Sequence, residues 1–174
     1  MQKVLLILAL LCPLSMSAHS ADSADTTQNK EADSIQAPIS LINDFHQAHK
    51  AVVARNSADF DTGVTAKMAE AIAAESALIM DYLIPIESYV EGHSKTDTRR
   101  KVERDCDAIA HDAYLQGHQL GWGGTGVVTD VAEAKRDHLL NRLVYYVVRV
   151  HKEDDTRFDL DAWLAILGIE IFDV

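Results

Sequence analysis

The sequence predicts an all-α protein, a single domain built as a bundle of about five helices. Apolar residues recur every three or four positions from Pro38 onward, which is the spacing of helices buried along one face. Six alanines between residues 66 and 77 strongly favour a helix there. The 174 residues, 48% of them hydrophobic, are enough for one core, and no repeat of about 20 to 50 residues divides the chain.

Residues 1–20 have the order of a secretory signal peptide: a positive charge at Lys3, an apolar run over 4–11, then small residues up to Ser20. The apolar run is shorter than the roughly 20 residues that span a bilayer. Leu11, directly before Cys12, argues against lipoprotein processing, because that position takes a small residue. We therefore expect cleavage after Ser20 and a periplasmic or secreted protein with no membrane insertion after cleavage.

Residues 21–37 are polar, small and acidic, which predicts a flexible leader before a helical domain over 38–174. Pro38 fits the first turn of a helix that continues to Arg55. A second helix begins from a cap at Asp59 or Asp61 and runs to Val90. Pro85 lies inside that pattern and predicts a bend, because proline lacks a backbone donor.

Three further helices follow. The third extends from Ser94 or Thr96 to Gly121, and the fourth from a cap at Thr129 or Asp130 to His151. Asp130 has the spacing of a capping box with Glu133. The β-branched second half of the fourth segment keeps helical spacing, so we expect it to be helical. A short last helix contains Trp163 and ends at Gly168.

Composition and motifs exclude several functions. A net charge of −11 gives the protein no electrostatic basis for holding nucleic acid phosphates. An anionic membrane surface would repel a protein of this charge. The glycines of 121–126 match a dinucleotide fingerprint in letters only, because they close a helix instead of following a strand. Cys106 is flanked by Asp105 and Asp107, which disfavour a reactive thiolate, so we interpret it as a packing residue.

A partner-binding surface is the function that the sequence favours. A glycine-rich loop can project a tryptophan, and an acidic run can attract a basic protein. The predicted partner-binding residues are Trp122, Gly123, Gly124, Thr125, Glu153, Asp154 and Asp155. We therefore expect an exported, non-enzymatic protein that binds another protein, as an inhibitor or an immunity-type antagonist of a toxin or hydrolase does. A homodimer is also compatible with the sequence.

A small periplasmic metal-binding protein is the alternative. His46 and His49 share one face of the first helix, and the third helix supplies His111 and His118. Facing helices in a bundle can hold zinc or copper in this way. None of these histidines has a glutamate three positions before it, so di-iron carboxylate chemistry is excluded.

Overall fold

The computed structural model describes residues 27–61, 65–121, 125–153 and 158–167. They form five helices and, within those ranges, no strand: α1 (Thr27–Asp61), α2 (Thr65–Glu91), α3 (Lys95–Gln119), α4 (Thr125–Glu153) and α5 (Leu160–Ile166). The all-α prediction is therefore confirmed. The expected signal peptide over 1–20 and the beginning of the expected leader lie outside the described residues.

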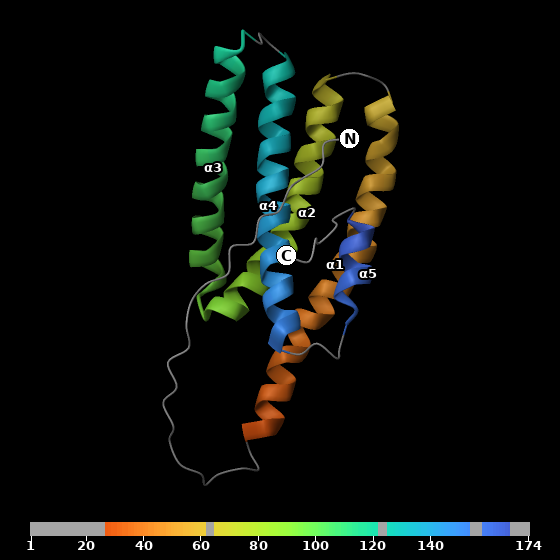
Figure 1. The fold of residues 1–174 in the computed structure, drawn as a ribbon, viewed down its shortest axis with the longest axis vertical. Coiled ribbons are helices and arrows are strands. Elements are labelled where there is room, and N and C mark those ends of the chain that lie inside the picture. Colours follow the sequence, from red (N-terminus) through yellow and green to blue (C-terminus); the bar gives the residue numbers. More distant parts are fainter. Residues whose placement is uncertain (1–26, 62–64, 122–124, 154–157, 168–174) are drawn as a thin grey trace.

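The helices α1 to α4 run alternately up and down, with α4 beside both α2 and α3, and the short α5 lies beside α1 (Figure 1). The outermost helix on one side is α3, and α1 lies on the other side (Figure 1). None of the described helices is both long and apolar enough to cross a membrane.

The first helix begins earlier than the sequence pattern predicts. It starts at Thr27 and passes through Pro38, so it includes residues 27–37 of the expected flexible leader. Proline removes one backbone hydrogen bond from a helix, but the turns on either side of it keep their own. Pro38 and Ile39 are buried, which holds the helix against the bundle at that point.

The second helix contains the predicted proline and bends. Pro85 lies inside α2, whose last turns swing toward the beginning of α3 (Figure 1). Gly92 ends the helix with a φ of 66°, a left-handed conformation that glycine adopts without steric cost. Ser94 then caps α3 by accepting a hydrogen bond from the Asp97 backbone N–H at 3.1 Å.

The β-branched second half of α4 is helical, as predicted. The helix starts at Thr125, however, earlier than predicted. The predicted start at Thr129 or Asp130, with its capping box, is therefore wrong. The physical reason lies across the hairpin, where Val127 is buried against Gly117 of α3. Packing against another helix overrides the local capping preference.

The core lies between α1, α2 and α4, with Val102 and Cys106 of α3 on one side, and it is completed by α5. Its fully buried members include Phe45, Leu83 and Leu143, and Trp163 of α5 closes it from the side. The Trp163 indole N–H donates to the Ile42 carbonyl oxygen at 3.2 Å, so the polar edge of this buried ring has a partner.

Candidate functional site: the outer end of the α3–α4 hairpin

The predicted partner-binding residues divide between the two ends of α4. Thr125 is its first residue and Glu153 its last, so at 1.5 Å per residue they lie about 42 Å apart. Trp122, Gly123 and Gly124, like Asp154 and Asp155, lie outside the described residues. Thr125 and Glu153 therefore lie at opposite ends of α4.

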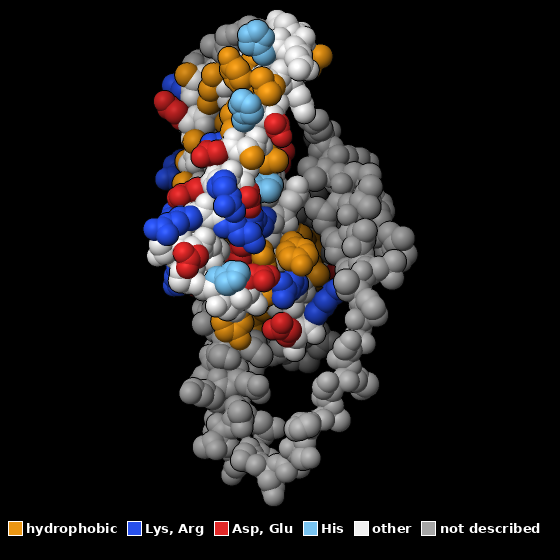
Figure 2. Space-filling model, turned by 90° about the vertical axis from the view of Figure 1, so that its left-hand side faces the viewer, with side chains coloured by type: hydrophobic (Ala, Val, Ile, Leu, Met, Phe, Trp, Pro, Cys, Tyr) orange, Lys and Arg blue, Asp and Glu red, His pale blue; other side chains and the backbone are white. Residues whose placement is uncertain are grey.

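Exposed hydrophobic side chains gather at the end of the hairpin where α3 passes into α4. We call Tyr114, Leu115, Leu120 and Val128, which are 50%, 43%, 65% and 56% exposed, the hairpin-end patch. It holds four of the seven large exposed hydrophobic side chains in the described part of the chain. Figure 2 shows hydrophobic side chains at this upper end of the α3 face. A grouping of this kind is typical of a protein contact surface, whereas single exposed hydrophobic residues are ordinary.

Close packing of the hairpin backbone explains why these side chains face outward. A Cβ atom placed on Gly117 would lie 3.1 Å from Val127 Cγ2, so the glycine permits an approach that other residues would obstruct. Gly121, at a φ of 73°, ends α3 in the left-handed conformation. Because the two helices meet at Gly117 and Val127, there is little interior at this end for larger side chains to fill.

The charge around the patch has one sign. Residues 105–134, which contain the patch, include five acidic residues and neither lysine nor arginine. The nearest cation across the hairpin is Lys135, whose Nζ lies 3.5 Å from Asp107 Oδ1. Asp112 is exposed beside the patch. The surface thus combines apolar contact area with negative charge, which favours a partner that carries positive charge around an apolar contact.

The histidines of the alternative metal site do not converge. His49 Nε2 lies 2.8 Å from Glu75 Oε1, and its ring stacks on Phe45 at a centroid distance of 5.2 Å. His111 and His118 are exposed on α3, which lies on the opposite side of the bundle from α1 (Figure 1). Among the described residues, no group of three or more histidine, cysteine or acidic side chains is placed to hold a metal ion. The geometry therefore does not assemble the predicted zinc or copper site.

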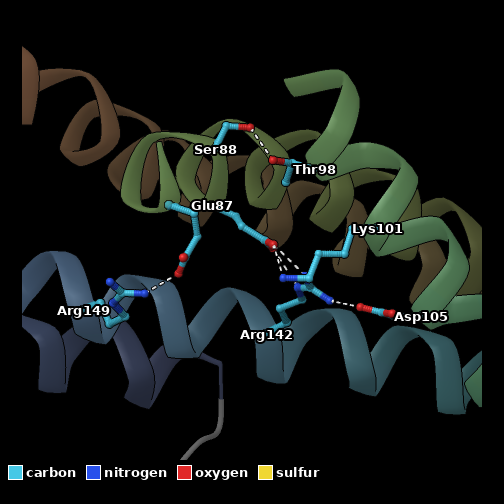
Figure 3. Close-up of polar contacts among 8 residues, drawn as sticks. Glu87, Ser88, Thr98, Lys101, Asp105, Arg142 and Arg149 are labelled. Carbon is cyan, nitrogen blue, oxygen red and sulfur yellow. Dashed lines mark hydrogen bonds and ion pairs between the residues drawn. The ribbon is translucent and has the colours of Figure 1, made fainter. Parts of the chain in front are cut away.

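The most deeply buried polar cluster joins α2, α3 and α4 (Figure 3). Glu87 of α2 is fully buried, and its two carboxylate oxygens accept hydrogen bonds from the Arg142 guanidinium at 2.7 and 2.6 Å. Arg142 also donates to Asp105 at 2.6 Å, and Lys101 Nζ lies 3.8 Å from Glu87. The hydrogen bonds to Glu87 raise the pKa of Arg142 above its ordinary value. Each carboxylate of the cluster is paired with a cationic side chain. The cluster therefore joins the three helices and offers no free acid or base.

A second pair extends this cluster along α4. Arg149 donates to Glu91 (Figure 3). Its guanidinium lies 5.8 Å from the centroid of the Tyr146 ring. Burial raises the pKa of Tyr146, and the carboxylates of Glu87 and Glu91 add to the effect. Nearby, the Ser88 hydroxyl lies 3.0 Å from the Thr98 hydroxyl in a buried contact between α2 and α3.

The ionic cluster is not among the predicted sites, although the sequence carries a signal for it. Glu87 follows the buried Leu83 by four residues, and Arg142 follows the buried Leu139 by three, so both stand on the apolar stripes of their helices. Opposite charges at two such positions predict a buried pair. Comparison of the chain with protein-family models, curated proteins and solved structures finds no match.

Proposed function

We propose that this chain is an exported, non-enzymatic helical protein that binds a basic partner protein through the hairpin-end patch, and that it acts as an inhibitor or immunity-type antagonist of a toxin or hydrolase. The observation that carries the proposal is the patch itself: four exposed hydrophobic side chains at one end of the hairpin, in a segment without lysine or arginine. The acidic net charge of −11 supports fast encounter with a basic target.

The composition of the patch also supports protein binding. Tyrosine is enriched among the residues that dominate binding energy, because a large ring buries much area at a small cost in side-chain entropy. Tyr114 is half exposed, and its ring lies 6.0 Å from that of His118. Leu120 and Val128 extend the apolar area to α4. Contact with the partner would lie at this end of the hairpin and leave the ionic cluster unchanged.

The test uses charged substitutions on the patch and at exposed control positions elsewhere. The double variant Leu120→Lys/Val128→Lys should lose the partner protein that copurifies with the tagged chain from its own producer, measured by native mass spectrometry. Val53→Lys and Tyr145→Lys, which change side chains that are 45% and 47% exposed elsewhere, should retain it.

Circular dichroism should show the same helix content in all of these variants. Equal retention by the patch variant, or equal loss by the controls, would contradict the proposed surface. Tyr114→Ala should weaken binding by about 2 kcal/mol, a factor of about 30 in Kd, if the ring is a dominant contact.

A further inference from the structure

Two adjoining hollows lie where α2 bends toward α3. Pro85 and Lys95 line both of them. The first has a volume of about 270 Å³ and is also lined by Asp81 and Arg99. The second has a volume of about 330 Å³ and is also lined by Leu41. The second hollow is near the lower limit of small-molecule sites, which hold about 300 Å³ or more.

The local sequence explains why the hollows form. Pro85 has no backbone N–H, so α2 bends near it and its last turns leave the line of the helix. Gly92 ends α2, and Ser94 caps α3 two residues later. This short turn returns the chain so that Lys95, the first residue of α3, lies beside Pro85.

The hollows carry a charge opposite to that of the protein. Residues 93–104 include five lysines and arginines against two acidic residues, in a chain whose net charge is −11. Figure 2 shows lysine and arginine side chains gathered over the lower part of the α3 face. Arg99 forms an exposed ion pair with Glu103, and the 3.8 Å between Nη1 and Oε1 is longer than a hydrogen bond.

The lining separates apolar from cationic groups. Pro38, Leu41 and Pro85 give the second hollow an apolar wall. Its other lining residues, Ser88, Tyr89, His93 and Lys95, carry polar groups. Lys95 and Arg99 stand against Asp81, the one carboxylate among the described lining residues. The lining residues therefore carry one net positive charge, and Glu103, which pairs with Arg99, lies outside the lining. A single carboxylate neutralises that charge, whereas a dianion would exceed it.

We infer that the two hollows bind a small amphipathic monoanion, an aliphatic carboxylate. Its carboxylate lies between Lys95 and Arg99, and its chain covers Leu41, Pro38 and Pro85. The site is separate from the hairpin-end patch, because it lies at the first turns of α3, whereas the patch lies at the last turns. Ligand binding here is therefore independent of partner binding.

The probe is octanoate, titrated into the full chain and followed by calorimetry. We expect saturable binding, about tenfold weaker in Lys95→Gln and in Arg99→Gln, which corresponds to about 1.4 kcal/mol for one lost charged contact. Arg100→Gln is the matched control, because Arg100 lies on the same helix, is 76% exposed and does not line either hollow. This variant should bind octanoate as the parent chain does.

Two further ligands separate the contributions of charge and chain. Octanol has the chain without the charge, and inorganic phosphate has charge without a chain, so both should bind at least about tenfold more weakly than octanoate. Absence of saturable octanoate binding would overturn the inference. Equal weakening by Arg100→Gln, or binding of phosphate as tight as that of octanoate, would show a general charge effect and would overturn it as well.

Discussion

Replacement of Arg142 by methionine should strongly destabilise the bundle, because it removes the main cation that pairs with the buried carboxylate of Glu87. Glu87 is 0% exposed, and Arg142 supplies both of its close hydrogen bonds, at 2.7 and 2.6 Å. After Arg142→Met, the nearest remaining cation is Lys101, whose Nζ lies 3.8 Å from the carboxylate. Breaking a buried ion pair on one side costs about 3 to 5 kcal/mol, because the other charge stays buried.

We expect a loss of about 3 kcal/mol in the free energy of unfolding, toward the lower end of that range. The Lys101 side chain is 45% exposed and free to move closer to Glu87, which recovers part of the lost interaction. Asp105, the other carboxylate that loses a partner, is 34% exposed and regains water. A loss of about 3 kcal/mol is a large part of the roughly 5 to 15 kcal/mol that stabilise a typical domain.

Arg149→Met is the matched control on the same helix. Arg149 pairs with Glu91, and the two side chains are 37% and 30% exposed, so solvent screens the pair and its removal should cost about 1 kcal/mol or less. The double variant Glu87→Met/Arg142→Met removes both buried charges and should recover most of the stability lost by Arg142→Met alone.

Urea unfolding followed by circular dichroism at 222 nm measures all three variants on one scale. The midpoint should fall in Arg142→Met while the slope of the transition stays constant, since the same surface is exposed on unfolding. If Arg142→Met cost no more than Arg149→Met, or if the double variant were as unstable as the single one, the assignment of a desolvated Glu87 charge would be refuted.

Three other predictions concern packing, protonation and thiol chemistry. Gly117→Ala should stabilise the chain by about 1 kcal/mol in a Val127→Ala background. The gain should be smaller in the parent chain, because there the new methyl group meets Val127. Urea unfolding midpoints in the two backgrounds measure the difference. Burial lowers the pKa of His138, so the unfolded state takes up protons first as the pH falls below about 6.5, and stability declines from there toward the lower folded-state pKa. His138→Gln should show a smaller loss of unfolding free energy than the parent between pH 7.5 and pH 5. Burial raises the pKa of the Cys106 thiol, so a thiol reagent should label the native chain slowly and the urea-unfolded chain rapidly; equal rates would contradict its buried position.

The helical architecture is predictable from the sequence because the apolar spacing of each helix is visible within its own segment. Leu139, Leu143 and Val150 keep helical spacing through a β-branched segment, and that spacing determined the structure there. The start of α4 was not predictable in the same way. It depends on the contact of Val127 with Gly117, and a capping pattern within one helix contains no information about the other.

The candidate site was also predictable only in part, because some of its features depend on how the helices pack. A binding role for the α3–α4 connection was suggested by its glycines, and the structure adds Leu120 and Val128, whose exposure depends on how the hairpin closes. Their spacing alone does not distinguish an outward side chain from a core one. Likewise, no spacing within α1 or α3 reveals that these two helices, which carry His49 and His111, lie on opposite sides of the bundle (Figure 1).

Site-specific crosslinking tests the proposed partner surface most directly. A benzophenone side chain is placed at Leu120, in the hairpin-end patch, or at Lys152, which is exposed near the other end of α4. Both chains are irradiated in their own producer. The proposed function predicts one crosslinked partner protein from position 120 and none from position 152. Crosslinking from position 152 alone, or from neither position while the partner still copurifies, would contradict it.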